Sequence, residues 1–347
     1  MSPPVSPLVS PPVCRIGVVL LNFNGWRDTV ACLRSLLAMT LKADYLVVCD
    51  NASTDGSFER LCWTVDGLPG SPGRRRVVEQ AQAAELAPQS GITLIRNADN
   101  LGFAAGNNVG IRHLLGDPAL THVWILNNDT EVDADALSAL ARASCARPEV
   151  GIWGATVLDH RDRTRVQALG GGAFDPWTGS TRHLGAFGRF PPGLQEPEQA
   201  ARIEHELRYV LGASMFVTRG WLQQVGLLDE RYFLYYEELD WAFRGGRRFA
   251  LGYAPQARVF HREGATAGTS PTGGSPLSVF HLHRSKLLFC RRHLPRYRLP
   301  TIVVASAWQS LKFLLRRRPA LALSTLRGML SGLFARAPGS VSWKPES

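Results

Sequence analysis

The chain of 347 residues contains little lysine and has no paired cysteine motif. Its only lysines are Lys42, Lys286, Lys312 and Lys344, so arginine supplies almost all of the positive charge behind a formal net charge of +10. None of the six cysteines stands in a Cys-x-x-Cys pair, and several lie in apolar runs. This pattern favours reduced cysteines that act as small hydrophobic side chains in a cytosolic protein.

Signals for export and for membrane spanning are also missing. The N-terminus is rich in proline and serine but lacks a basic start and a continuous apolar stretch, so we expect a disordered leader at residues 1–14 rather than a secretory signal. From Leu299 to Leu333 the chain is apolar, but its longest uncharged stretch is too short for a spanning helix.

The excess of arginine narrows the possible ligands. Arginine suits bidentate contact with phosphate oxygens, so charge alone leaves nucleic acid, anionic lipid and sugar diphosphates open. No base-reading motif or aromatic RNA-binding signature accompanies the basic residues, and we therefore expect no nucleic acid partner. With 45% hydrophobic residues, the chain has enough apolar material for a substantial globular core.

Short apolar runs alternate with segments of helical periodicity. The runs Ile16 to Leu21, Tyr45 to Cys49, Ile92 to Ile95 and Val123 to Leu126 read as strands. Repeated strand-then-helix units predict an α/β fold with a mainly parallel central sheet flanked by helices. The Pro-, Gly- and Arg-rich stretch at about 66–90 interrupts this order and reads as a surface insertion.

Four short polar segments are the candidates for chemistry. They are Asp50-Asn-Ala-Ser-Thr-Asp-Gly56, Asn100-Leu-Gly-Phe-Ala-Ala-Gly-Asn-Asn108, Asn127-Asn-Asp129 and Glu237-Glu-Leu-Asp240. The first and third directly follow apolar runs, so both are expected at the carboxyl ends of strands, where open α/β sheets bind ligands.

The first two segments each have two interpretations. Asp50 at the end of a buried strand needs hydrogen-bond donors, which a pyrimidine imide or a ribose hydroxyl supplies; the alternative is a turn or helix cap built with Ser53 and Asp55. In the second segment Gly102 permits close backbone approach and Asn107 offers an amide, with tight helix packing as the alternative.

The two acidic segments suit group transfer from a diphosphate. A diphosphate leaving group needs a hard divalent cation, and Asp129 offers a carboxylate for it, unless the turn only caps a helix. Glu237, Glu238 and Asp240 follow an aromatic run. Desolvation beside aromatic surface raises the proton affinity of a carboxylate, which suits a general base, and a solvated helix N-terminus is the alternative.

Together these segments resemble the inverting glycosyltransferase family 2, and its rhamnosyltransferase-like members in particular. The likeness runs from about Ile16 to Leu294. Besides the four segments, it rests on Leu20-Leu-Asn-Phe-Asn24, Leu211-Gly-Ala-Ser-Met215, Val225-Gly-Leu-Leu-Asp229, Phe233-Leu-Tyr-Tyr236, Val259-Phe-His261 and Arg284-Ser-Lys286.

The resemblance implies a GT-A fold, a nucleotide-diphosphate sugar donor and Mg²⁺ or Mn²⁺. It implies a glycosyltransferase domain at residues 15–295, with a nucleotide-sugar half at about 15–158 and an acceptor half at about 159–295. Glu238 and Asp240 would be catalytic, and Asp129 and His261 would hold the metal. The donor would be bound by residues Asn22, Asn24, Asp50, Ser53, Asp55, Asn100, Gly102, Asn107, Asn127, Arg284 and Lys286.

Two positions depart from the family pattern. Asn127 replaces the first acid of the metal-binding D-x-D motif, so metal binding should depend on Asp129, with His261 as a second ligand or a diphosphate contact. Glu238 stands where many relatives carry aspartate, so its carboxylate lies one methylene farther from the backbone.

The tail at residues 296–347 combines apolar helix faces with Arg316, Arg317 and Arg318. Such helices suit the anionic surface of a membrane, and a helical pair packed on the catalytic domain is the alternative. We therefore expect a cytoplasmic, hexose-transferring enzyme peripheral on the inner face of the cell membrane. It would move a sugar, rhamnose by resemblance, from a dTDP- or UDP-sugar to a lipid-linked or polysaccharide acceptor.

Two rival functions stay open at this stage. A nucleotidyltransferase shares the sheet and the metal requirement, but would show a glycine-rich, basic phosphate loop after the first strand, which residues 22–26 lack. A glycan-binding module without catalytic activity is the non-enzymatic rival, and Asn127 is the residue that favours it.

Overall fold

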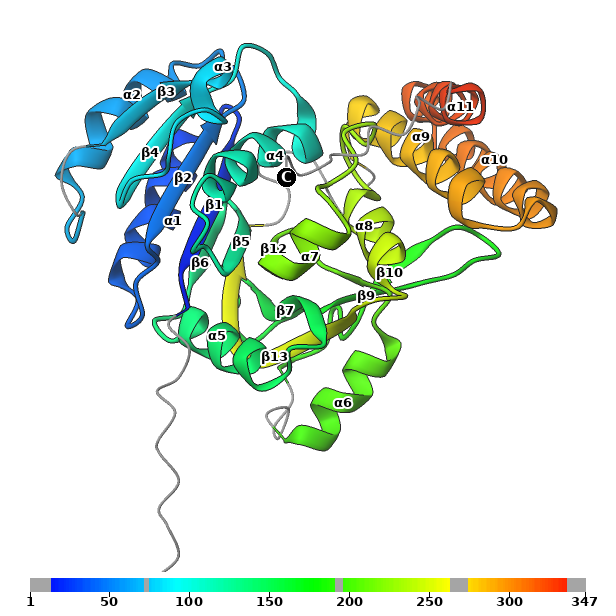
Figure 1. The fold of residues 1–347 in the computed structure, drawn as a ribbon. Helices are drawn as coiled ribbons and strands as arrows, with labels where there is room; N and C mark the ends of the chain where they lie inside the picture. Colours follow the sequence, from blue (N-terminus) through cyan, green and yellow to red (C-terminus); the bar gives the residue numbers. More distant parts are fainter. Residues whose placement is uncertain (1–13, 72–74, 191–195, 263–273, 336–347) are drawn as a thin grey trace, which may run out of the picture.

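The computed structural model describes residues 14–71, 75–190, 196–262 and 274–335 (Figure 1). Nearly all of the predicted leader at residues 1–14 lies outside the described residues, and so does the end of the tail. Within them, the main sheet has the strand order β3-β4-β2-β1-β5-β12-β7-β13-β6, and β8 pairs with β7 beside this path. The α/β fold predicted from the sequence is confirmed.

The first half of the sheet is fully parallel. It contains β1 (Ile16–Asn22), β2 (Tyr45–Asp50), β3 (Arg76–Glu79), β4 (Gly91–Arg96) and β5 (His122–Asn127). The next strand, β12 (Ser214–Thr218), runs antiparallel to both of its neighbours, β5 and β7. The remaining strands are β6 (Thr130–Val132), β7 (Val150–Asp159), β8 (Val166–Leu169) and β13 (Ala250–His261).

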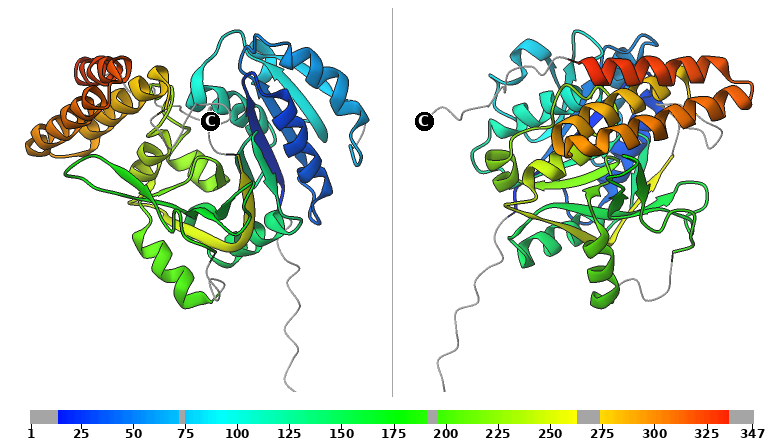
Figure 2. Two further views of the ribbon diagram at one scale, coloured as in Figure 1. Left: turned by 180° about the vertical axis from the view of Figure 1, so that it is seen from behind. Right: turned by 90° about the vertical axis from the view of Figure 1, so that its right-hand side faces the viewer.

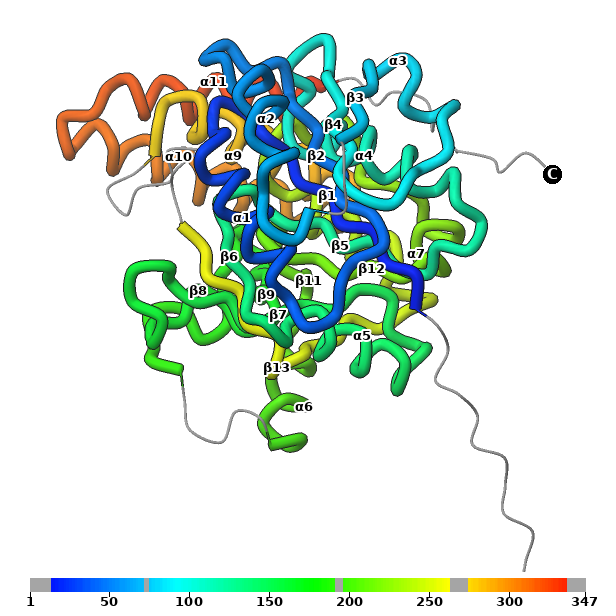
Figure 3. The backbone as a smooth tube through the Cα atoms, turned by 90° about the vertical axis from the view of Figure 1, so that its left-hand side faces the viewer, coloured from blue at the N-terminus to red at the C-terminus, as the bar shows by residue number. Residues whose placement is uncertain are grey.

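Helices cover both faces of the parallel half (Figure 3). Alternate residues of a strand point to opposite faces, so Val18 belongs to the same apolar cluster as Leu33 of α1 (Trp26–Ala38), while Val19 belongs to that of Ile111 of α4 (Gly102–Leu115). Helices α2 (Ser57–Thr64) and α5 (Ala136–Ala146) belong to the α1 side. Burial on both faces explains why these strands are continuous apolar runs in the sequence.

The stretch at about 66–90, for which we predicted a surface insertion, takes part in the sheet. After the 3₁₀ turn Val65–Gly67, it supplies β3, which pairs in parallel with β4, and then the short helix α3 (Gln80–Ala83). Val78 and Ala83 are buried. The apolar pair Val77-Val78 within an otherwise polar segment is the sequence signal for this edge strand.

The second half of the chain adds a small sheet and several helices. Strands β9 (Gly171–Phe174), β10 (Thr181–His183) and β11 (Tyr209–Val210) form the order β10-β9-β11. The helices here are α6 (Pro197–Glu206), α7 (Arg219–Gln224) and α8 (Glu237–Gly245). The last of these begins at the predicted acidic cluster.

Three C-terminal helices lie together at one side of the molecule (Figure 2). They are α9 (Pro276–His293), α10 (Leu299–Leu315), which follows a 3₁₀ turn at Arg296–Arg298, and α11 (Pro319–Phe334). Gly328 and Gly332 allow α11 to approach α9 closely. A Cβ at either position would overlap the carbonyl oxygen of Phe280 or Arg284. Within the described residues, no helix combines the length and apolarity needed to cross a membrane.

Candidate active site

The predicted donor-side residues meet at the carboxyl edge of the parallel strands. Asn22 at the end of β1 lies in register with Asp50 at the end of β2, and Asn127 at the end of β5 pairs with the neighbouring Leu21. Ligands in open α/β sheets bind outside this edge. The position predicted from the apolar runs is therefore the position these side chains take.

Asp50 closes a turn of its own segment. Its Oδ1 accepts from the Ser53 backbone N–H at 3.0 Å, and its Oδ2 accepts from Ser53 Oγ at 2.7 Å and Asn22 Nδ2 at 2.6 Å. Asn24, with φ of 53°, donates its N–H to the same Ser53 Oγ. The capping interpretation thus describes the contacts seen, and the turn is held rigid beside the strand ends.

The structure adds Asn51, which sequence reasoning missed. Its Nδ2 donates to Asn100 Oδ1 at 2.9 Å and to the Gly102 carbonyl at 3.2 Å, while its Oδ1 accepts from Asn97 Nδ2 at 3.1 Å. Asn51 therefore joins the first predicted segment to the second. Its place directly after Asp50, in a segment already singled out, was the available signal.

Three other predicted donor residues make local contacts. Asp55 Oδ1 accepts from the Ser57 N–H at the start of α2, and Asn100 Oδ1 also accepts from the Gly102 N–H. Asn107 is buried and donates to the Phe103 carbonyl. Its Oδ1 has no partner among the described residues.

Gly102 is required for close approach between the two halves of the chain. It has φ of 76°, and a Cβ there would lie 2.4 Å from the Phe233 carbonyl oxygen. The Phe103 N–H donates to that same oxygen at 2.7 Å. Since Phe233 lies just before the acidic cluster, the start of α4 holds the acceptor-side loop against the donor-side edge.

Asp129 and His261 come together although 132 positions separate them in the sequence. His261 Nε2 lies 3.2 Å from Asp129 Oδ1, and the two side chains are only 12% and 6% exposed. Asn127 Nδ2 lies 3.5 Å from the same Nε2. Strand pairing explains the meeting, because β13 runs antiparallel to β6 with His261 opposite Thr130.

This pair fits a divalent cation as two ligands of mixed oxygen and nitrogen type. Within the described residues, no group of three or more histidine, cysteine or acidic side chains gathers into a metal cage. A cation at Asp129 and His261 would therefore take its remaining positions from phosphate oxygens and water, as magnesium sites on nucleotides commonly do.

Glu237 and Glu238 begin α8 after two residues in the left-handed region. Tyr235 and Tyr236 both have φ of 68°, a conformation that costs free energy in residues with a Cβ and that marks functional loops. Among the described residues, the Oε2 atoms of both glutamates are buried without a hydrogen-bond partner. Sequence reasoning predicted the helix but gave no sign of this backbone strain.

Burial changes the proton affinity of both carboxyl groups. It raises the pKa of Glu238 to about 7. Burial, together with the neighbouring Glu238 charge, raises the pKa of Glu237 well above its ordinary value. A carboxylate with a pKa near the working pH is suited to general base catalysis.

Asp240, predicted as catalytic, is instead locked in a buried ion-pair cluster. It accepts from His293 Nε2 at 2.7 Å and from Arg244 Nε at 2.8 Å, and it lies 3.3 Å from Arg292. Burial alone would raise its pKa, but the bond from His293 and the two arginine charges outweigh burial and lower it. Asp240 therefore anchors α8 to α9, and its lowered pKa suits it less than Glu238 to general base catalysis.

Arg284 and Lys286, predicted to bind phosphate, also make their contacts elsewhere. Arg284 donates to the Arg231 carbonyl at 2.8 Å. Lys286 is buried on α9, where its side chain packs at Gly179, and burial lowers its pKa. Arg284 thereby ties α9 to the loop that contains Arg231, and the phosphate-binding role of both residues stays a prediction.

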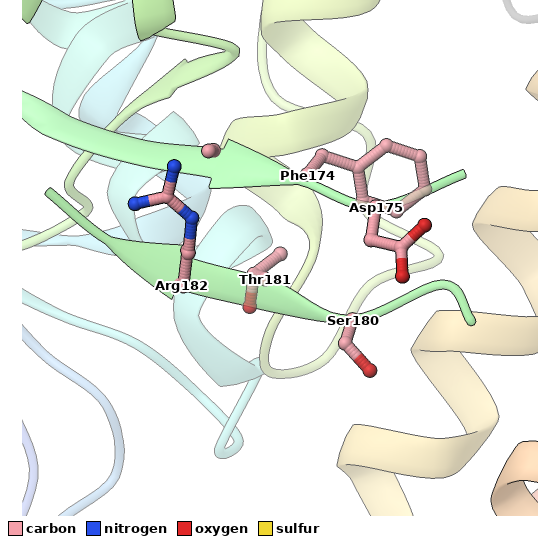
Figure 4. A pocket seen from close by; sticks show the side chains of 6 residues that line it. Phe174, Asp175, Ser180, Thr181 and Arg182 are labelled. Atoms are coloured by element: carbon pink, nitrogen blue, oxygen red, sulfur yellow. The ribbon is translucent and has the colours of Figure 1, made fainter. Parts of the chain in front are cut away.

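A shallow cavity of about 240 Å³ lies on the hairpin of β9 and β10 (Figure 4). Asp175, Ser180 and Arg182 contribute polar side chains to it, and none of the predicted site residues lines it. The lining residue Thr181 bonds the buried Tyr209, whose pKa is raised by burial and by the Glu238 charge. Tyr209 therefore links the cavity to the neighbourhood of Glu238.

Comparisons with known proteins find similarity to glycosyltransferases. Residues 70–186 match the family model described as glycosyl transferase family 2. The chain is 26% identical over 308 residues to the N-acetylglucosaminyl-diphospho-decaprenol L-rhamnosyltransferase of Mycobacterium tuberculosis, covering 82% of this chain and 86% of that protein. It is 22% identical over 214 residues to the low-salt glycan biosynthesis hexosyltransferase Agl10 of Haloferax volcanii, covering 60% and 63%.

Two solved structures share this fold. The mannosyltransferase PcManGT from Pyrobaculum calidifontis, in complex with GDP-Man and Mn²⁺, matches 94% of this chain and 89% of its own at a TM-score of 0.51 and 16% identity. GalNAc-T7 with UDP, GalNAc and Mn²⁺ matches 81% of this chain and 48% of its own, at a TM-score of 0.53 and 14% identity.

The fold, with its edge of polar turns, is the GT-A fold. More particularly, the chain is similar to the rhamnosyltransferase-like members of glycosyltransferase family 2, as its motifs predicted.

Proposed function

We propose that this glycosyltransferase is an inverting, metal-dependent enzyme that moves a hexose, expected to be rhamnose, from a dTDP- or UDP-sugar to a lipid-linked glycan. The observation that carries the proposal is the contact between its two halves. The start of α4, bonded to Asn51 on the donor side, also bonds Phe233, four residues before the glutamate pair. In this proposal, one site combines the donor edge with Glu238 as the base, whose Oε2 is buried.

The acceptor class rests on the relatives. The mycobacterial relative is named for a diphospho-decaprenol acceptor that carries N-acetylglucosamine. An acceptor of this class joins a glycan to a long lipid, and the chain matches most of that relative's length. We therefore propose a polyprenyl-diphosphate-linked sugar as the acceptor, used in the synthesis of a cell-surface glycan.

The proposed mechanism is a single displacement. The Glu238 carboxylate takes the proton of the acceptor hydroxyl while that oxygen bonds the anomeric carbon and the bond to the nucleoside diphosphate breaks, so the configuration inverts. Asp129 and His261 would hold Mg²⁺ or Mn²⁺, which supplies positive charge that stabilises the departing diphosphate. The raised pKa of Glu237 favours its protonated form, so Glu237 places no second negative charge beside Glu238.

A panel of nucleotide sugars tests the function directly. The protein is incubated with dTDP- and UDP-sugars and either Mg²⁺ or Mn²⁺, with a short polyprenyl-diphosphate N-acetylglucosamine acceptor present. Acceptor-dependent release of nucleoside diphosphate supports the proposal. Exchange of pyrophosphate into the nucleotide sugar would indicate a nucleotidyltransferase, and donor or glycan binding without turnover would indicate the non-enzymatic module.

The outer side of α10 and α11 is suited to a membrane surface. These two helices contain no acidic residue. Leu315 and Phe334 are 71% and 79% exposed, and the other large apolar side chains exposed on them are Val304, Trp308, Leu311, Leu314, Leu323, Leu326 and Leu330. Lys312 and Arg316 to Arg318 lie on and between them. We propose that this apolar and basic surface holds the enzyme on the cytoplasmic face of an anionic membrane, where a lipid-linked acceptor resides.

Vesicle binding should depend on both charge and apolar contact. The protein should sediment with vesicles containing phosphatidylglycerol but not with pure phosphatidylcholine, and binding should fall as salt is raised to about 1 M, where the Debye length shrinks to about 3 Å. At about 1 kcal/mol per basic residue, Arg316→Gln with Arg317→Gln should weaken partitioning roughly thirtyfold.

A matched pair of tryptophans controls this experiment. Trp308→Ser should reduce vesicle binding, whereas Trp63→Ser, at a position 87% exposed on α2, should leave it unchanged. Equal partitioning onto both vesicle types, or equal effects of the two tryptophan changes, would contradict a membrane role for α10 and α11.

A further inference from the structure

Gln167 on β8 contacts the candidate metal ligand His261 in two places. Its Nε2 donates to the His261 carbonyl oxygen at 2.9 Å, and its Oε1 lies 2.9 Å from His261 Nδ1. The strands bring them together, because β7 lies between β8 and β13 and pairs with both. None of the motifs recognised in the sequence contains Gln167.

The contacts of Gln167 determine which way its amide is oriented. A backbone carbonyl only accepts hydrogen bonds, so the atom facing the His261 oxygen must be the amide nitrogen. With the amide nitrogen facing that carbonyl, the amide oxygen is the atom that faces the imidazole ring.

The amide orientation in turn determines the tautomer of His261. The Gln167 oxygen can only accept, so His261 Nδ1 must carry the proton. In the neutral ring, Nε2 then bears a lone pair directed at Asp129 Oδ1, 3.2 Å away. The Asn127 amide at 3.5 Å is a donor toward the same lone pair. A lone pair and a carboxylate oxygen that face each other repel, unless a cation lies at that place.

We propose that Gln167 is a positioning residue that fixes the Nδ1–H tautomer of His261 and so presents Nε2, with Asp129, to a divalent cation. The inference rests on the proposed function, because that function supplies the reason for a metal. Metal-ligating histidines usually donate their second ring N–H to a carboxylate, carbonyl or water, and loss of this partner lowers metal affinity about 10- to 100-fold.

The tautomer is measured first, in protein without metal or nucleotide. With ¹⁵N-labelled histidine at pH 8, the ring of His261 should show a protonated Nδ1 and an unprotonated Nε2, assigned by comparison with the His261→Gln variant. Gln167→Met has a similar length but lacks both hydrogen-bonding atoms, so it should shift the ring toward the Nε2–H form. Gln167→Glu retains an acceptor for Nδ1 and should keep the native tautomer.

Metal affinity is measured second, by Mn²⁺ titration followed by electron paramagnetic resonance with UDP or dTDP present. Gln167→Met should weaken Mn²⁺ binding about 10- to 100-fold, and Gln167→Glu should weaken it less. Gln223→Met, an exposed substitution of the same kind on α7, should change neither measurement. Circular dichroism on each variant separates these effects from unfolding.

The outcomes separate this inference from the proposed function. A proton on Nε2 in the wild-type protein, as in a simple ion pair of His261 with Asp129, would overturn the role of Gln167 even if the enzyme transfers sugar. So would Mn²⁺ affinity unchanged in folded Gln167→Met. The predicted tautomer without any Mn²⁺ binding by the wild type would contradict both the metal site and the inference, while sugar transfer itself would be tested independently by product formation.

Discussion

Replacing Glu238 by glutamine should lower turnover about 10²- to 10⁴-fold, the usual contribution of a general base, with little change in donor affinity. Glutamine keeps the size of the side chain and its ability to hydrogen bond, but it cannot take the acceptor proton. The measurement is acceptor-dependent release of nucleoside diphosphate at saturating donor, together with calorimetric titration of UDP or dTDP.

The pH dependence of the wild-type enzyme also tests the assignment of Glu238 as the general base. A base acts in its ionised form, and burial raises the pKa of Glu238 to about 7, so kcat/KM should rise with pH up to about 7 and then level off. The rising limb should disappear in Glu238→Gln. A limb at the ordinary glutamate pKa would indicate that the base is a solvated carboxylate.

A variant of Asp240 separates a structural role from catalysis by the neighbouring Glu238. Asp240→Asn removes the charge paired with Arg244 and His293, so it should lower the melting temperature. The turnover of the enzyme that stays folded should change little. Glu198→Gln, on the exposed face of α6, is the matched control and should change neither. If folded Asp240→Asn alone gave the turnover defect, the assignment of Glu238 as the base would be wrong.

Asp129→Ala should abolish metal-dependent transfer while leaving the fold intact. Asp129 supplies the carboxylate of the candidate cation site, and Asn127 in the same turn brings no negative charge. We expect activity to fall more than tenfold, a barrier increase above roughly 1.4 kcal/mol, and Mn²⁺ binding to be lost. Asp135→Ala, at an exposed position six residues farther along, should retain both.

Activity at a raised Mn²⁺ concentration is a second measurement on this variant. A higher Mn²⁺ concentration should restore little activity to Asp129→Ala, because only His261 remains of the two proposed protein ligands. Retention of more than about a tenth of wild-type activity would place the cation elsewhere in the site.

The donor-side edge was predictable from short stretches of sequence. Buried parallel strands are apolar on both faces, so their ends stand out where Asp50 and Asn127 follow apolar runs. Parallel strands also end at one edge of the sheet, so turns far apart in sequence meet there. The contacts among the side chains at that edge were harder to predict. Asn51 was missed because an asparagine in a turn usually has no role beyond the turn itself.

The roles of several charged residues depended on contacts that no local pattern records. Asp240 belongs to the same short acidic segment as Glu238, yet its partner His293 lies 53 positions away on α9. Arg284 and Lys286 matched a family motif, but the packing of α9 engages them with backbone and buried surface. For Asp240 the cost of burying a charge is offset by Arg244 and His293, and only the packed helices create this pairing.

The sequence by itself determined the α/β fold, the resemblance to glycosyltransferase family 2 and the edge at which the polar turns lie, because strand periodicity and short motifs are properties of neighbouring residues. The resemblance had already pointed to Glu238 as the base. Only the tertiary structure showed that Glu238 and Asp240 differ in their surroundings, that His261 faces Asp129, and that Gln167 contacts His261. These depend on burial and on hydrogen-bond direction between distant strands. Both arise only when the sheet and α9 are assembled, since proton affinity and tautomer depend on the surroundings of a side chain.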